Sequence, residues 1–204
     1  VRVKDLALDP SAFPNAKELQ QSENLGRLKT TTTMGDSNGD GLYEEIYGYG
    51  GRSFAIMDGN SGKIIYDSGN DIAVRTAFTG FFNWNEDAGS FDDRSDDKGA
   101  EPEAITVGEI DGKTYAFVGL ERQGGIMMYD ITGIIKPKFV GYFNGRNFFG
   151  DGTKMTGGDI SPESLVFIPA DKTPPAYKAL NNGPLLIGAY ELSGSTAVYQ
   201  ISNN

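Results

Sequence analysis

Histidine and cysteine are both absent from this 204-residue sequence, and basic residues are few. Without histidine there can be no Ser-His-Asp or Cys-His catalysis and no histidine-ligated zinc site. Without cysteine there can be no disulfide, thiolate metal site or thiol nucleophile, and the redox compartment stays open. The 18 Lys and Arg residues face 28 Asp and Glu residues, for a formal net charge of -10. This excess of carboxylates argues against nucleic acid as a partner and favours divalent cations.

Long apolar runs are also absent. Stretches such as Leu185 to Ile187 fall far short of the about 18 residues that a membrane-spanning helix needs, so we expect no membrane span. No segment has the pattern of a signal peptide. The first residue is Val1 and not methionine, from which we expect a processed product or a part of a longer protein. The groups left for chemistry are carboxylates, hydroxyls, lysines and arginines.

Short segments rich in Ile, Val, Tyr and Phe, separated by Gly, Asp and Asn, fill the chain from residue 29 onward. This pattern is typical of β-strands joined by tight turns. Strands are expected at 29–34, 45–49, 53–57, 63–66, 104–110, 114–120, 126–131, 138–143, 164–168, 184–190 and 196–201. Residues 1–28 differ, because Pro10 and Pro14 interrupt them and Asn15 can cap a short helix over 17–21.

Internal repeats indicate how the predicted strands are arranged. Pro-Glu-Ala-Ile at 102–105 reappears as Pro-Glu-Ser-Leu at 162–165, and further matches follow in the same order. A weaker third copy covers 47–58. Repeats of about 60 residues with about four strands each are typical of propeller blades, although a β-sandwich is the alternative. We therefore predict an all-β fold: a partial β-propeller of about three four-stranded blades over residues 29–204, preceded by a linker with a short helix over 1–28.

The most specific local motif is Gly-Asp-Ser-Asn-Gly-Asp-Gly at 35–41. It begins like an EF-hand calcium loop, but position twelve is Tyr47 and not the required glutamate. Glu44 falls at position nine, the spacing of the short FG-GAP type of calcium loop between propeller strands. The predicted Ca²⁺ ligands are the side chains of Asp36, Asn38, Asp40 and Glu44 and the carbonyl of Leu42. The alternative is a hydrophilic hairpin without an ion.

The same stretch spells Gly-x-Ser-x-Gly around Ser37, the pattern of a hydrolase nucleophile elbow. Such an elbow needs a following helix and a histidine partner. The sequence has no histidine, and a strand is expected next. We therefore predict that Ser37 is not a nucleophile.

Eight carboxylates fall within 18 residues: Glu86, Asp87, Asp92, Asp93, Asp96, Asp97, Glu101 and Glu103. Such a run is typical of a solvated loop. However, Glu103 and Glu163 begin equivalent predicted strands, and inner propeller strands begin near the central channel. These carboxylates, with Glu121 and Glu191 at the ends of equivalent strands, are expected to ring that channel. The ring could be structural, metal-binding or catalytic, and we favour structural pairing with arginines.

Several longer runs resemble one known family. They are Gly-Asp-Ser-Asn-Gly-Asp-Gly (35–41), Tyr-Gly-Gly-Arg-Ser-Phe-Ala-Ile (49–56), Tyr-Asp-Ser-Gly (66–69), Asp-Asp-Arg-Ser-Asp-Asp-Lys-Gly-Ala-Glu-Pro-Glu (92–103), Gly-Glu-Ile-Asp-Gly-Lys-Thr-Tyr-Ala-Phe-Val-Gly-Leu-Glu-Arg (108–122) and Gly-Gly-Ile-Met-Met-Tyr-Asp-Ile (124–131). These runs are similar to the C-terminal half of choice-of-anchor I proteins, which include the mesenchyme-specific cell surface glycoproteins of animals. The resemblance implies a propeller and an extracellular or cell-surface location.

Two functions follow as hypotheses. The first is a non-enzymatic, calcium-binding extracellular propeller module with a structural, adhesive or matrix-interaction role. The second is a metal-dependent phosphomonoesterase, because family members are often labelled alkaline phosphatase-like. Three blades leave two open flanks, so the expected partners are a missing N-terminal propeller half or copies of the chain itself, as a homo-oligomer or filament.

Overall fold

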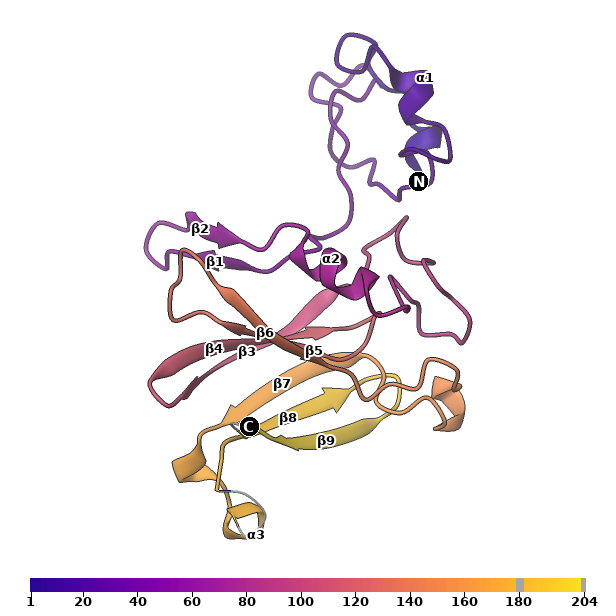
Figure 1. The fold of residues 1–204 in the computed structure, drawn as a ribbon. Helices are drawn as coiled ribbons and strands as arrows, with labels where there is room; N and C mark the ends of the chain where they lie inside the picture. Colours follow the sequence, from indigo (N-terminus) through magenta and orange to yellow (C-terminus); the bar gives the residue numbers. More distant parts are fainter. Residues whose placement is uncertain (179–181, 203–204) are drawn as a thin grey trace.

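Three antiparallel sheets form the body of the molecule in the computed structural model, which describes residues 1–178 and 182–202 (Figure 1). The first sheet pairs β1 (Ala55–Met57) with β2 (Ile64–Asp67). The second has the order β3 (Pro102–Ile110), β4 (Lys113–Leu120), β5 (Ile126–Asp130) and β6 (Lys138–Phe143). The third has the order β7 (Pro162–Ile168), β8 (Leu185–Tyr190) and β9 (Ser195–Gln200).

Helical structure is sparse. The α-helices are α1 (Ala16–Leu19), α2 (Asp71–Ala77) and α3 (Pro175–Lys178), and single 3-10 turns lie at Val3–Asp5, Gly152–Lys154 and Ala170–Lys172. The all-β prediction is confirmed. The described residues form an open stack and not a closed ring, and of their three sheets only the second has four strands.

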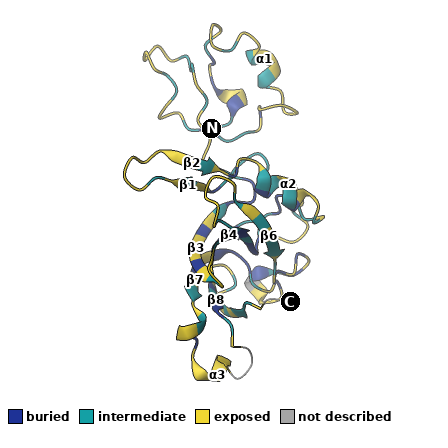
Figure 2. Ribbon diagram, turned by 60° about the vertical axis from the view of Figure 1, so that its left-hand side comes forward, coloured by how far each residue is buried: buried dark blue, intermediate teal, exposed yellow. Residues whose placement is uncertain are grey.

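Strand β4 of the middle sheet is buried on both faces from Ala116 to Leu120, where successive residues point to opposite sides. Val118 joins one apolar cluster, which packs beneath α2 and β1 and includes Ile72 and Phe54. Phe117 joins a second cluster, between β3–β6 and β7–β9, with Leu165. The three sheets therefore stack as layers with a core on each side of the middle one (Figures 1 and 2).

The two larger sheets begin in the same way, as the internal repeat predicted. Glu101 and Ser161 both adopt a left-handed backbone conformation, with φ of 59° and 62°. The carbonyl of Glu101 accepts a hydrogen bond from the Glu121 N–H at 2.7 Å, and that of Ser161 accepts one from the Glu191 N–H at 2.8 Å. Each first strand also carries a register shift at its Pro-Glu pair. The repeat is therefore structural and not a chance likeness of sequence.

Two expected strands, at 29–34 and 45–49, are not regular strands. Between them the chain forms one isolated antiparallel bridge, Thr30 to Gly48, and the Thr31 N–H donates to the Tyr47 carbonyl. Figure 1 shows this region and α1 as a separate lobe beside the first sheet. A hairpin without a sheet or helix to cover it is only marginally stable. Its apolar side chains stay exposed here, as Met34 and Tyr49 illustrate.

The other expected strands are confirmed with small shifts of their ends. The helix expected over 17–21 is α1, which ends at Leu19. Helices α2 and α3 were not expected. None of the helices in the described part of the chain has the length and apolarity needed to cross a bilayer.

Candidate functional site

The predicted cation loop lies at the tip of the loose hairpin in the N-terminal lobe. Its base is closed by Gly35, whose carbonyl accepts hydrogen bonds from the N–H groups of Glu44 at 2.8 Å and Glu45 at 3.1 Å. The turn needs glycine at this position, because φ is +103° and a Cβ would lie 2.3 Å from the Glu45 carbonyl oxygen. Tyr43 holds the loop to the N-terminal segment by a bridge to Leu8.

Three of the predicted ligand side chains converge. Asp36, Asp40 and Glu44 each offer one carboxylate oxygen, and these oxygens all lie within 4.8 Å of one another. Asn38 lies beside them: its Nδ2 donates to Glu44 Oε1 at 2.9 Å, and its Oδ1 accepts from the Asp40 N–H at 2.8 Å. The loop thus brings Asp36, Asn38, Asp40 and Glu44 together as their spacing predicted. Three like charges this close repel one another unless a cation compensates them.

Backbone N–H groups fix these side chains in place. Asp36 accepts from Gly39 at 2.7 Å and from Gly41 at 2.9 Å, and Asp40 accepts from Leu42 at 2.8 Å. These bonds fix the orientation of the Asp36 and Asp40 carboxylates. Preorganised oxygen ligands from alternate residues are the arrangement that Ca²⁺ takes in short loops.

Ser37 belongs to this loop and not to a catalytic arrangement. Its N–H and its hydroxyl both donate to Glu44 Oε2, at 2.8 and 3.0 Å. No helix lies between Ser37 and Phe54, so the geometry of a nucleophile elbow is missing from this described stretch. The hydroxyl helps to orient a predicted ligand.

The acidic run from Glu86 to Glu103 forms a second cluster, which is extensively ion-paired. Glu101 is its centre: the side chain is 5% exposed and pairs with Lys98, with Arg94 at 3.1 Å and with Arg122 at 3.1 Å. Arg122 also pairs with Glu86 and, at 2.9 Å, with Glu121. The run therefore has two parts: Asp87, Asp92, Asp93 and Glu103 are exposed, whereas the ion pairs around the buried Glu101 form a charge network at one end of the middle sheet.

Glu101, Glu103 and Glu121 also bring carboxylate oxygens within 4.8 Å of one another. Burial, a hydrogen bond with Glu103 and the nearby charges of Glu103 and Glu163 raise the pKa of Glu121 to about 8. These effects outweigh the nearby charge of Lys98, which lowers the pKa. The expected gathering of carboxylates at the starts and ends of equivalent strands is thus present. Arginine and lysine compensate much of its charge.

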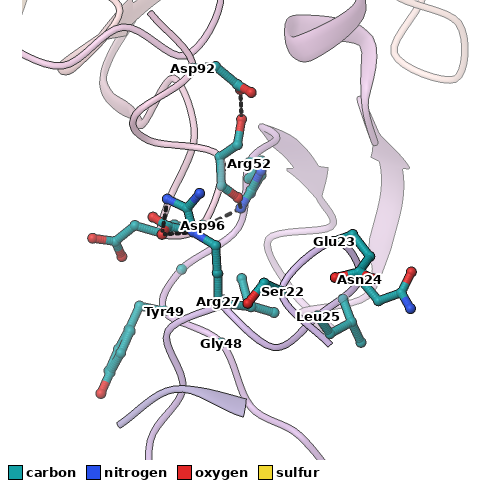
Figure 3. A pocket seen from close by; sticks show the side chains of 14 residues that line it. Ser22, Glu23, Asn24, Leu25, Arg27, Gly48, Tyr49, Arg52, Asp92 and Asp96 are labelled. Atoms are coloured by element: carbon teal, nitrogen blue, oxygen red, sulfur yellow. Dashed lines mark hydrogen bonds and ion pairs between the residues drawn. The ribbon is translucent and has the colours of Figure 1, made fainter. Parts of the chain in front are cut away.

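The acidic run also anchors the N-terminal lobe. Asp96 accepts from Arg2 at 2.8 Å and from Arg27 at 3.0 Å, while Asp97 pairs with Lys29 at 2.7 Å. Figure 3 shows Arg27 and Asp96 pointing toward one another. They lie at the wall of a polar pocket of about 630 Å³ between the N-terminal lobe and the acidic run. Burial would raise the pKa of Asp96, but the hydrogen bonds from Arg2 and Arg27 hold it below the ordinary value.

These contacts between the N-terminal lobe and the acidic run could not be predicted from the sequence. The partners Arg2 and Asp96 are 94 residues apart, and Arg27 and Asp96 are 69 apart. The only available signal was the contrast between a few basic residues near the N-terminus and a dense acidic run.

Comparisons with known proteins agree with the resemblance seen in the sequence. The family model described as "Choice-of-anchor I domain" matches residues 2–134. The chain is also 27% identical to Gigasin-3a of Magallana gigas over 198 residues, a match that covers 90% of this chain and 66% of Gigasin-3a. The chain thus spans slightly less than two thirds of that relative's length. No solved structure gives a significant match. Since the family model covers well over half of the chain, this protein belongs to the choice-of-anchor I domain family.

Proposed function

We propose that this chain is a calcium-binding module of an extracellular or cell-surface β-propeller, with a structural, adhesive or matrix-interaction role and no catalytic one. The observation that carries the proposal is the gathering of carboxylate oxygens from Asp36, Asp40 and Glu44 within 4.8 Å of one another in a closed loop, with Asn38 hydrogen-bonded beside them. Family membership supports the surface location. The matching openings of β3 and β7 support the propeller, because they repeat one blade-like unit.

Calcium fits this loop better than other common metals do. The three carboxylates that gather there offer oxygen ligands, and the chain lacks the histidine and cysteine that zinc and copper prefer. Bound ion would stabilise the folded state by RT ln(1 + [L]/Kd), about 2.7 kcal/mol at a hundredfold excess over Kd. The gain would fall mainly on the N-terminal lobe, whose hairpin has little other support.

The test compares melting temperature with calcium and with chelator. Asp36→Asn together with Asp40→Asn should abolish the difference, because asparagine keeps the backbone hydrogen bonds and removes two charges. Asp58→Asn is the matched control. Asp58 accepts from Ser61 at 2.7 Å in a similar turn but belongs to neither carboxylate cluster. Equal melting with and without calcium in the unsubstituted chain would overturn the proposal.

A phosphomonoesterase is the less favoured function. Such an enzyme needs a metal centre open to the phosphate. The trio of Glu101, Glu103 and Glu121 is the second place where carboxylates gather among the described residues, and Lys98, Arg94 and Arg122 already hold Glu101. Turnover of a generic phosphomonoester that is abolished by EDTA, with the fold retained, would reverse this preference.

Two incompletely covered sheet faces support the proposed partners, an N-terminal propeller half or further copies of the chain. Ile105 and Val107 of β3 are each 53% exposed on the same face of the middle sheet as Val118, which the short first sheet covers only in part. Val166 of β7 is 52% exposed on the face turned away from β3. In a propeller, each of these faces would be covered by a neighbouring blade. Light scattering on the 204-residue chain should therefore show association at micromolar concentration, and a stable monomer with one sharp melt would contradict it.

A further inference from the structure

A cluster of aromatic rings lies where two connections between the sheets meet. Trp84 is its centre and is only 5% exposed. The rings of Phe81, Phe91, Phe148 and Phe149 all contact it edge-on, with centroids 5.4 to 6.4 Å from its own. Two of these rings are open to solvent, since Phe91 is 57% and Phe149 is 78% exposed. The cluster therefore has a buried base and an aromatic outer surface.

The position of this cluster differs from that of a sheet face or a sheet edge. Residues 78–101 lead from α2 to β3 and residues 144–161 lead from β6 to β7, and both connections lie on the same side of the stack (Figure 1). Phe81 of the first connection stacks on Phe148 of the second, with 3.9 Å between their ring centroids. The exposed rings thus lie outside the places where a further strand or sheet would pack.

Exposed carboxylates rim these rings. Residues 87–93 fold over Trp84, whose Nε1 donates to the Asp87 carbonyl at 2.9 Å, and the Asp92 N–H donates to the Phe82 carbonyl at 2.9 Å. Asp87, Asp92 and Asp93 are all exposed. None of the three forms an ion pair within residues 1–178 and 182–202.

Two arginines lie near the cluster, but both are engaged elsewhere. Arg146 is buried, with its Cζ 4.8 Å from the centroid of the Phe148 ring, and it donates to the Asn85 carbonyl. Arg94 pairs at 3.2 Å with Asp97. The outer surface of the cluster is therefore both aromatic and negatively charged.

A pocket beside Phe149 offers room for an apolar side chain. Its volume is about 380 Å³, and Phe81, Phe148, Phe149 and Asn147 are among the residues that line it. Apolar anchors that fill such pockets supply most of the energy of a protein interface. Cations, in turn, are attracted to the faces of aromatic rings and to carboxylates. One partner chemistry satisfies both features.

We propose that this aromatic–acidic surface binds a basic segment of another protein, in which lysines or arginines flank an aromatic or branched apolar residue. The apolar side chain enters the pocket beside Phe149. The flanking cations lie over the exposed rings and beside the carboxylates of Asp87, Asp92 and Asp93. The net charge of -10 attracts such a segment from a distance. The inference is independent of the calcium proposal, because none of these residues belongs to the cation loop.

The chain has a single tryptophan, so its fluorescence reports on this surface directly. The probe is an unlabelled heptapeptide in which lysines alternate with leucine, phenylalanine and leucine, titrated into the 204-residue chain. We expect a saturable change in the emission of Trp84, and an affinity that falls as added salt screens the charges. A control peptide with glutamate in place of every lysine should cause no change.

Phe149→Ser tests the apolar part of the surface. It should weaken binding of the probe, read from the midpoint of the titration, by about tenfold or more. Ile135→Ser is the matched control, because Ile135 is also 78% exposed. Ile135 precedes β6 whereas Phe149 follows it, so the two residues lie at opposite ends of that strand.

Asp92→Asn together with Asp93→Asn tests the charges. Asparagine tolerates the left-handed φ of 60° at Asp92, so the turn should keep its shape. The double variant should bind the probe several-fold more weakly and depend less on salt. Glu109→Gln together with Asp171→Asn is the control, because it removes two exposed charges outside the surface and should leave the affinity unchanged.

Several results would overturn the proposal. They are a titration without a saturable change, equally tight binding of the glutamate peptide, and equal affinities in Phe149→Ser and Ile135→Ser. A change in Trp84 emission caused by phosphatidylcholine vesicles but not by the probe would make a lipid surface the occupant. A change caused by rising protein concentration alone, and abolished by Phe149→Ser, would make it a second copy of the chain.

Discussion

Gly108 of β3 lies directly against the ring of Phe167 of β7, so that a Cβ on Gly108 would sit 2.4 Å from two ring carbons. The same ring stacks on Phe117 of β4, at 5.8 Å between centroids and an interplanar angle of 19°. The distance between the second and third sheets is thus limited by a position without a side chain. Gly108 is required by this close approach and not by a positive φ.

Gly108→Ala should destabilise the fold by about 1–3 kcal/mol, the usual cost of overpacking a tight core. Chemical denaturation measures this change. Gly141→Ala is the control, because the space around its Cβ position is open, and it should change the free energy of unfolding little. If both variants unfold at the same denaturant concentration, the sheets are not packed as described.

Docking of the N-terminal lobe should depend on salt. Asp96→Asn weakens the contacts from Arg2 and Arg27, and it should raise amide exchange in residues 1–30 by an amount equivalent to about 1 kcal/mol. High ionic strength should act in the same direction. Since folding lowers the pKa of Asp96, its contribution is present above the ordinary value of 3.8 and is lost as the pH falls through the lower folded value.

Asp171→Asn is the control for this experiment. Asp171 lies 3.9 Å from Lys172, and both side chains are 74% exposed, so neither exchange nor stability should change. Equal exchange in Asp96→Asn and Asp171→Asn would show that the ion pairs do not hold the lobe.

Stability should fall as the pH rises from about 4.5 to about 8, owing to Glu121. Folding raises the pKa of this carboxyl to about 8, so the folded protein keeps a proton that the unfolded chain has released. Its contribution is complete below the ordinary value of 4.5 and is lost as the pH passes through the folded value. Glu121→Gln stays neutral at every pH and should gain about 1 kcal/mol over the unsubstituted chain at pH 9.

Denaturation at several pH values measures this effect. Glu109→Gln, at an exposed position of β3, should keep the pH profile of the unsubstituted chain. If the free energy of unfolding falls with rising pH as steeply in Glu121→Gln as in Glu109→Gln, another group causes the effect.

Ser37 should not react as a nucleophile. Its hydroxyl donates to the Glu44 carboxylate, a much weaker base than the histidine of a hydrolase, and no helix follows within the described stretch up to Phe54. A fluorophosphonate probe is expected to leave it unlabelled. Covalent labelling at Ser37, located by peptide mass, would contradict both this prediction and the role of Ser37 as a support for Glu44.

The strands from β3 onward were predictable, because alternating apolar residues and glycine turns mark them locally. Helix α2 was not. It has only seven residues, several of them β-branched, and depends on distant contacts: Ile72 lies in the core, Tyr129 donates to Asp71 at 2.9 Å, and Arg75 lies 3.7 Å above the Phe139 ring. Conversely, 29–34 has the composition of a strand but no sheet to join.

The carboxylate cluster of Asp36, Asp40 and Glu44 could be predicted because its side chains follow one another within nine residues. The charge network around Glu101 could be predicted from the sequence only in part. The density of carboxylates was visible in the sequence. Their partner Arg122 and the left-handed turn at Glu101 depend on how β3 and β4 pair, which no local pattern records.

The turns that open the two larger sheets have the same backbone conformation but carry different side chains. The same left-handed residue and the same carbonyl contact accommodate a carboxylate at Glu101 and a hydroxyl at Ser161. Glu101 gathers three cations there, whereas the Ser161 hydroxyl donates to Glu86 at 3.4 Å. Each repeat thus offers an exchangeable position whose charge can be altered alone. A chain built from such repeats can diversify one end of its surface unit by unit while its architecture stays constant.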